Sequence, residues 1–287
     1  MQSDNQMIYR TTIRDFDPLQ TFLCGQCFRW EQDNTGLWSG IVLGRQLRLE
    51  WQNGECTFYG VDERQFNQDY ASYFDLDTDY TAIKEALCQK DDHLNKAIAF
   101  GGGIRLLRQD LWEVLLSFVI SQNNGIPRIK QIIESLSRLF GSPLSGEADG
   151  FAFPQPEALM AASLEQLKLC RSGYRCRYIS AIADRLAGTP ELLSQLHCLP
   201  KEKARELLLS LPGIGQKVAD CVLLYSGIDR SAFPVDRWVK RVMEALYFKR
   251  ETDENTIREF AKDYFGDLAG IAQQYLFYYA RAHKIGL

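Results

Sequence analysis

The stretch that most constrains this chain is LPGIGQKVADC, from Leu211 to Cys221. Gly213 and Gly215 permit a sharp backbone turn with positive φ. The apolar spacing on either side predicts helices over 201–210 and 217–226. We therefore expect two helices joined by a tight turn. The first N–H groups of the second helix have no partner within it, so the turn is suited to bind a phosphate oxygen.

Two nucleotide-binding motifs also use glycines in this way, and neither fits here. The dinucleotide-binding fingerprint needs a strand directly before the turn, whereas residues 201–210 are predicted to be helical. The Walker motif needs Ser or Thr directly after its lysine, but Val218 follows Lys217, and the first glycine of that motif is missing.

Lys217 lies in the first turn of the second predicted helix, where the helix dipole disfavours a cation. Most lysines are solvated surface residues, but one kept at such a place can act as a nucleophile. Pro234, Val235 and Asp236 form a second short motif at the start of a helix predicted over 235–248. Asp236 is placed to cap that helix, and a carboxylate fixed in this way can also stabilise positive charge during a reaction.

These motifs resemble the helix-hairpin-helix and Gly/Pro-Asp motif of the DNA glycosylase superfamily. KVADC and PVD, with CGQCFRW (Cys24–Trp30) and AQQYLF (Ala272–Phe277), are more narrowly similar to 8-oxoguanine DNA glycosylases of the eukaryotic type. The matches cover most of the chain. The resemblance implies a base-excision repair enzyme that flips 8-oxoguanine out of duplex DNA, preferably opposite cytosine, excises it and cuts the strand by β-elimination.

The resemblance also implies roles for individual residues. Lys217 would be the nucleophile and Asp236 the catalytic carboxylate. The pocket for 8-oxoguanine would be formed by Gly25, Cys221, Pro234, Gln273 and Phe277. The carbonyl of Gly25 would contact the base, which carries a hydrogen on N7 that guanine lacks. A glycine at a strand-start bulge is the alternative interpretation of this residue.

Contacts to the rest of the DNA would come from Asn123, Arg128, Tyr174, Arg175, Gly213 and Gly215. By resemblance, Asn123 fills the space left by the flipped base, Tyr174 is a wedge, and the two arginines contact the orphaned cytosine. Loop capping by Asn123 and core packing by Tyr174 are the alternatives. The chain departs from the family at Trp238, where relatives have a histidine that helps to hold DNA.

Composition limits the class of protein further. The chain has 287 residues, which suits one large or two ordinary domains, and 46% hydrophobic content suits a packed core. A net charge of −4 argues against broad nonspecific coating of DNA but not against a local basic face. No apolar run is long enough for a membrane span or a signal peptide. We therefore expect an intracellular protein, in the cytoplasm with the nucleoid or in the nucleus.

The eight cysteines are scattered, so we expect mostly small buried residues. Cys24 and Cys27 have metal or redox spacing, but no second pair accompanies them. No cysteine follows Cys221, which excludes the four-cysteine iron–sulfur loop that many relatives of this superfamily carry near the C-terminus. The implied chemistry needs no metal or organic cofactor. The expected partner is duplex DNA containing 8-oxoguanine, bound by a monomer.

The predicted fold class is α+β. Residues 7–60 alternate apolar and polar and include the hairpin signal Asn53-Gly54, which predicts an antiparallel sheet. From Thr81 the period becomes helical, with a buried helix over 110–122 and a last helix over 267–283. We expect an N-terminal β subdomain with a connecting helix over 1–100 and a mostly α-helical glycosylase domain over 101–287.

Two other functions compete with 8-oxoguanine excision. A glycosylase of the same superfamily could act on another damaged purine, although Lys217 counts against a purely monofunctional enzyme. A noncatalytic protein could use the hairpin only to bind DNA, but binding alone needs neither Lys217 nor Asp236.

Overall fold

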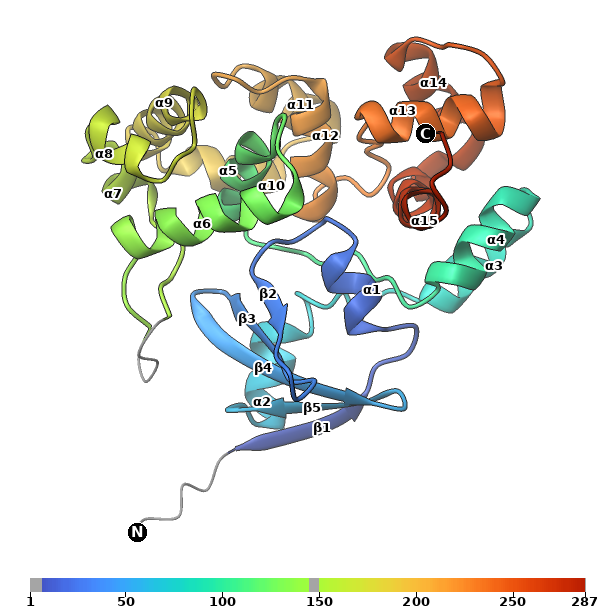
Figure 1. The fold of residues 1–287 in the computed structure, drawn as a ribbon, viewed down its shortest axis with the longest axis horizontal. Helices are drawn as coiled ribbons and strands as arrows, with labels where there is room; N and C mark the ends of the chain where they lie inside the picture. Colours follow the sequence, from blue (N-terminus) through green and yellow to red (C-terminus); the bar gives the residue numbers. More distant parts are fainter. Residues whose placement is uncertain (1–6, 145–149, 287) are drawn as a thin grey trace.

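The computed structural model of the protein describes residues 7–144 and 150–286 (Figure 1). The N-terminal part is a five-stranded antiparallel sheet with strand order β1-β5-β4-β3-β2. Its strands are β1 (Ile8–Thr12), β2 (Trp30–Gln32), β3 (Trp38–Val42), β4 (Arg45–Gln52) and β5 (Glu55–Tyr59). Asn53 and Gly54 both have positive φ and turn β4 into β5, as the hairpin signal predicts.

One segment within 7–60 is helical rather than extended. Helix α1 (Pro18–Leu23) starts after Asp17, whose carboxylate accepts a hydrogen bond from the backbone N–H of Gln20. Phe22 of this helix stacks on Trp30 of β2, with ring centroids 4.0 Å apart. The helix is too short to show a periodic pattern, so only its start is marked in the sequence, by Asp17 and by Pro18 directly after it.

The rest of the chain is mostly helical, as predicted. Beside the sheet lie the short helix α2 (Glu63–Gln65) and a π-helical turn (Phe66–Tyr70). The main helices are α3 (Tyr80–Cys88), α4 (Asp92–Gly101), α5 (Leu111–Ser121), α6 (Ile126–Phe140), α7 (Pro156–Met160), α8 (Leu164–Leu169), α9 (Arg175–Ala187), α10 (Glu191–Cys198), α11 (Lys201–Leu209), α12 (Gln216–Tyr225), α13 (Arg237–Met243), α14 (Glu254–Phe265) and α15 (Ala269–His283). In Figure 1 helices α5–α12 form one group and α13–α15 another, with the sheet below both. None of the described helices has the length and apolar character needed to cross a membrane.

Buried side chains form two hydrophobic clusters. The smaller one fills the sheet side and reaches Phe74 and Leu107. The larger one is helical, contains nearly all of α5, and takes in Leu87 of α3 and Leu94 of α4. Helix α3 and most of α4 thus pack with the helical body although they lie before residue 100, and the division near that residue stays a prediction.

The predicted hairpin is present as α11, a turn and α12. Gly213 has φ +76, and a Cβ there would lie 2.5 Å from the ring of Tyr178, so this position requires glycine. Gly215 differs from the expectation because its φ is −101. It is the N-cap of α12, and a Cβ there would meet no atom within 4 Å. The backbone at Gly215 is therefore open to a ligand that approaches the helix N-terminus.

Candidate active site

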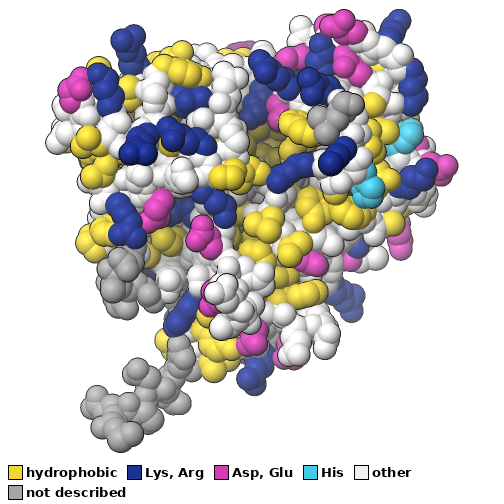
Figure 2. Space-filling model, in the orientation of Figure 1, with side chains coloured by type: hydrophobic (Ala, Val, Ile, Leu, Met, Phe, Trp, Pro, Cys, Tyr) yellow, Lys and Arg dark blue, Asp and Glu magenta, His cyan; other side chains and the backbone are white. Residues whose placement is uncertain are grey.

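A cavity of about 340 Å³ lies where α5, α12 and α15 meet the loop after α1. Every residue predicted to act in catalysis or to hold the base lines it: Gly25, Lys217, Cys221, Pro234, Asp236, Gln273 and Phe277. In Figure 2 Lys and Arg side chains lie on both sides of a hollow whose walls are mostly hydrophobic. The cavity thus brings together residues that are up to 252 positions apart in the sequence (277 − 25).

Lys217 enters the cavity from the first turn of α12, as the sequence predicts. Its Nζ lies 3.2 Å from the hydroxyl oxygen of Ser121, the last residue of α5, and 5.2 Å from the centre of the Phe118 ring. No described carboxylate lies within ion-pair distance of this amine. The amine is therefore held by the Ser121 hydroxyl, the Phe118 ring face and the nearby Cys221 thiol rather than by a salt bridge. No motif in the sequence marks Ser121 or Phe118 as a site residue.

Asp236 caps α13, as predicted. Its Oδ1 accepts hydrogen bonds from the backbone N–H groups of Trp238 at 2.9 Å and Val239 at 2.8 Å. Both bonds end on one oxygen, so Oδ2 has no hydrogen-bond partner among the described residues. The cap fixes the carboxylate at the cavity wall and leaves one oxygen available to a reacting group.

The cavity lining includes a buried amide oxygen without a hydrogen-bond partner among the described residues. Gln273 is 4% exposed, and its buried Oε1 has no hydrogen-bond partner among the described residues. The neighbouring Gln274 is satisfied, because it accepts from the Tyr225 hydroxyl at 2.7 Å and donates to the Cys24 carbonyl at 3.1 Å. A buried amide oxygen without a partner costs free energy, so the Gln273 oxygen is suited to receive a donor from a ligand.

Gly25 lines the same cavity from the loop after α1. Its φ of +94 favours glycine, and a Cβ there would lie 3.8 Å from both Phe277 and Ile126. The loop is fixed by the buried Gln26, which donates to the carbonyls of Thr21 at 2.9 Å and Arg105 at 2.8 Å. Gly25 therefore follows a helix rather than starting a strand at a bulge, and its backbone is held close to the Phe277 ring.

The cysteines of the site are neutral wall residues. Burial raises the pKa of the Cys221 thiol to about 12 and that of the Cys24 thiol to about 11. Cys24 and Cys27 are both free and buried, and their thiols contact the backbone carbonyls of Thr21 and Phe22. The pair is thus part of the packed interior, as expected for most cysteines of this chain.

The predicted DNA-contacting residues lie outside the cavity, and three of them meet beside it. The Asn123 amide is 3.5 Å from the hydroxyl of Tyr174, whose side chain is 50% exposed. The Arg175 guanidinium lies 4.5 Å from the Tyr174 ring centre. Arg128 is exposed and joins this cluster indirectly, by donating to the Arg171 carbonyl at 2.8 Å.

Arg175 differs from an open recognition residue because it is buried. Its guanidinium donates to the backbone carbonyls of Gln122, at 2.9 Å from Nε, and Ser172, at 3.2 Å. The side-chain amide of Gln122 donates in turn to the carbonyl of Gly213 in the hairpin, at 3.1 Å. Residues 121–123 at the end of α5 therefore contact Lys217, the hairpin turn and the Tyr174 cluster in succession.

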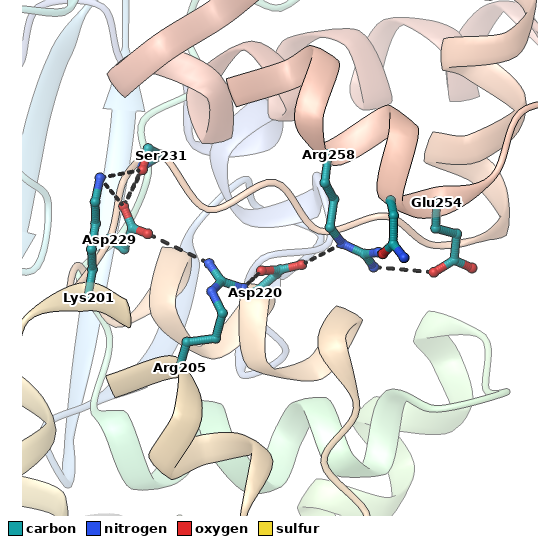
Figure 3. Close-up of polar contacts among 8 residues, drawn as sticks. Lys201, Arg205, Asp220, Asp229, Ser231, Glu254 and Arg258 are labelled. Atoms are coloured by element: carbon teal, nitrogen blue, oxygen red, sulfur yellow. Dashed lines mark hydrogen bonds and ion pairs between the residues drawn. The ribbon is translucent and has the colours of Figure 1, made fainter. Parts of the chain in front are cut away.

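Helix α12 is held in place by a buried ionic network (Figure 3). Asp220 is 1% exposed, and its carboxylate binds Arg205 of α11 and, at 3.2 Å, Arg258 of α14. Arg205 also reaches Asp229 in the segment that leads to Pro234. Removing one partner from such a network leaves an uncompensated buried charge, so the network fixes the helix that carries Lys217.

Comparisons with known proteins show the family of this chain. Residues 116–265 match the family model of the HhH-GPD superfamily base excision DNA repair proteins, and residues 8–115 match that of the 8-oxoguanine DNA glycosylase N-terminal domain. The chain belongs to the HhH-GPD superfamily. It is 32% identical to a probable N-glycosylase/DNA lyase of Methanothermobacter thermautotrophicus, over 72% of this chain and 71% of that protein.

Two solved structures share the whole architecture of this HhH-GPD protein. A structure of MBOgg1 in complex with a low-affinity DNA ligand has a TM-score of 0.92 and 42% identity, covering 96% of each chain. The Clostridium acetobutylicum 8-oxoguanine glycosylase/lyase, solved with double-stranded DNA containing cytosine opposite 8-oxoguanine, has a TM-score of 0.91 and 37% identity. The alignment covers 97% of this chain and 99% of that one.

Proposed function

We propose that this protein is a bifunctional DNA glycosylase and lyase that excises 8-oxoguanine from duplex DNA. The observation that carries the proposal is the single cavity that holds the Lys217 amine, the capped Asp236 carboxylate and the unsatisfied Gln273 amide. The first two groups suit excision and lyase chemistry at a deoxyribose, and the third suits recognition of a purine edge. The relatives named N-glycosylase/DNA lyase and 8-oxoguanine glycosylase/lyase support the same activity.

The reaction begins when the damaged nucleotide leaves the helix and enters the cavity. The lone pair of Lys217 Nζ attacks C1′ of the deoxyribose, the C1′–N9 bond breaks, and 8-oxoguanine leaves with the bonding electrons. The Asp236 carboxylate stabilises the positive charge that develops on the sugar. Loss of a proton from the nitrogen and opening of the sugar ring give a Schiff base at C1′. Loss of a C2′ proton then expels the 3′ phosphate by β-elimination.

Recognition of the base uses three sides of the cavity. The flipped base lies between the side chains of Cys221 and Phe277, and the Gln273 amide contacts its Watson–Crick edge. The Gly25 carbonyl accepts the hydrogen on N7 of 8-oxoguanine, which guanine lacks. The cavity volume of about 340 Å³ suits one purine with its sugar.

Outside the cavity, we propose that Tyr174 and Asn123 replace the flipped base in the stack and that Arg128 and Arg175 contact the orphaned cytosine. The exposed ring of Tyr174 supports a stacking role. The backbone at Gly213 and Gly215 would bind a phosphate oxygen. We further propose that the enzyme acts inside the cell as a monomer without an iron–sulfur cluster.

A lesion screen tests the substrate. Purified protein is incubated with duplexes that carry 8-oxoguanine, 3-methyladenine or adenine opposite 8-oxoguanine, and released bases are identified by mass spectrometry. We expect release of 8-oxoguanine. Release of 3-methyladenine alone would assign the protein to another damaged purine, and binding of all duplexes without release of any base would make it a noncatalytic DNA-binding protein.

A further inference from the structure

Helix α15 places three side chains along the cavity at positions i, i+4 and i+8: Gln273, Phe277 and Arg281. The first is buried, the second is half-buried and the third is exposed. An α-helix rises 1.5 Å per residue, so this stripe spans about 12 Å. The stripe therefore runs from the closed end of the cavity to its mouth, and its chemistry changes from an amide to an aromatic ring to a cation.

A nucleotide has the same order of chemistry, from the polar edge of the base to its face and then to the sugar and phosphate. The proposed function uses the first two members of the stripe for the base and leaves the third without a role. We propose that Arg281 binds a phosphodiester next to the flipped nucleotide. This inference rests on the proposed function, because it needs a nucleotide in the cavity.

The charges around the cavity support this assignment. Its charged lining residues are Lys217, Asp236 and Arg281. Lys217 is hydrogen-bonded to Ser121, and Asp236 is engaged with the N-terminus of α13. Among the described residues, by contrast, no group forms a hydrogen bond or ion pair with Arg281. A guanidinium at the mouth is thus free for a phosphate, for which its planar donor fork is well matched.

Trp238 supplies a second donor at the same cavity. It is half-buried at the start of α13, and its indole N–H has no acceptor among the described residues. An indole N–H can donate but carries no charge. Arg281 therefore brings the charge, and Trp238 can add one neutral hydrogen bond.

An arginine in the last turn of a helix has a plainer explanation, which is attraction to the negative end of the helix dipole. Arg185 is a matched case, because it is exposed, lies in the last turn of α9 and does not line this cavity. The dipole explains both residues equally. It does not account for the position of Arg281 at the end of a stripe that begins at Gln273.

The test measures how binding depends on salt. All proteins carry Lys217→Gln so that the DNA is not cut, and Kd is measured on a duplex with 8-oxoguanine opposite cytosine over a range of salt concentrations. Each neutralised phosphate contributes about −0.9 to the slope of log K against log salt. We expect Arg281→Ala and Arg281→Gln to weaken binding and to make the slope shallower by about 0.9. Arg281→Lys should keep the slope, and Arg185→Ala should match the parent.

A second set of duplexes locates the contact. An uncharged methylphosphonate replaces each phosphate around the lesion in turn. On one of these duplexes Arg281→Ala should cause no further loss of binding. The inference would be overturned if Arg281→Ala and Arg281→Gln both kept the salt dependence of the parent protein. It would also be overturned if Arg281→Ala weakened binding to every methylphosphonate duplex as much as it weakens binding to the unmodified duplex. Equal binding of damaged and undamaged DNA by the parent would instead count against the proposed function, and the slopes on damaged DNA would still decide the Arg281 contact.

Discussion

The hydroxyl oxygen of Ser121 lies 3.2 Å from Nζ of Lys217 and donates its own hydrogen to the Phe118 carbonyl at 2.8 Å. The hydroxyl therefore accepts from the lysine amine, and the end of the buried helix α5 fixes the direction of the nucleophile. Since α12 is itself held by Asp220, Arg205 and Arg258, both ends of this contact are anchored.

Ser121→Ala should slow formation of the Schiff base by about tenfold, which corresponds to the loss of one positioning hydrogen bond. Single-turnover cutting of an 8-oxoguanine duplex measures this rate. Ser194→Ala is the control, because Ser194 makes the same kind of hydrogen bond to a carbonyl three residues earlier but does not line the cavity. An equal effect of the two substitutions would mean that Ser121 acts only through helix stability.

Gln273→Leu should separate activity from stability. It removes a buried oxygen that lacks a partner, so the free energy of unfolding should stay the same or rise by about 1 kcal/mol. Excision of 8-oxoguanine should fall by about tenfold to a hundredfold, because the base loses one or two hydrogen bonds. Chemical denaturation and single-turnover assays measure the two quantities. Full activity in this variant would remove Gln273 from base recognition.

The two arginines near Tyr174 should respond differently to substitution. Arg128→Ala should reduce the preference for cytosine over adenine opposite the lesion and change the free energy of unfolding by no more than about 0.5 kcal/mol, because Arg128 is exposed. Arg175→Ala should lower both the preference for cytosine and the free energy of unfolding, since it leaves the carbonyls of Gln122 and Ser172 without their donor. The preference is measured as the ratio of excision rates on duplexes with cytosine or adenine opposite 8-oxoguanine, and the free energy of unfolding is measured by denaturation curves. An unchanged ratio in both variants would contradict the assigned roles.

Stability should depend on pH through Glu113. Burial raises the pKa of Glu113 from 4.5 to about 7, with Arg29 at 3.6 Å opposing the shift. The folded state holds this proton more tightly than the unfolded chain, so the contribution of Glu113 to stability is fully present below pH 4.5 and is lost as pH rises to about 7. The unfolding free energy of wild type relative to Glu113→Gln should therefore fall over this range. Glu134→Gln, at an exposed ion pair, should show no such trend.

The elements that carry a local signal can be predicted from the sequence. The hairpin follows from Gly213 and the helical spacing around it, the Asp236 cap follows from residue type and position, and the buried helix α5 follows from its continuous apolar run. Helix α1 is marked only at its start, by Asp17 and Pro18, and is too short to interrupt the alternating pattern around it, which by itself predicts strand.

Contacts between distant segments could not be predicted from such local signals. The hydrogen bond of Gln274 to the Cys24 carbonyl joins residues 250 positions apart, and the position of Ser121 beside Lys217 joins residues 96 apart. Neither pair has a spacing that marks it in the sequence. The burial of Arg175 was also hidden, because charged residues are rarely buried unless the backbone supplies acceptors, as Gln122 and Ser172 do here.

Borohydride trapping on a duplex with one 8-oxoguanine opposite cytosine tests the central claim most directly, because it reports the lesion, the Schiff base and the nucleophile together. We expect a covalent protein–DNA adduct with wild type and none with Lys217→Ala, while Lys203→Ala, at an exposed lysine of α11, should form the adduct normally. Release of 8-oxoguanine by wild type without any adduct, or an adduct that persists in Lys217→Ala, would contradict the account.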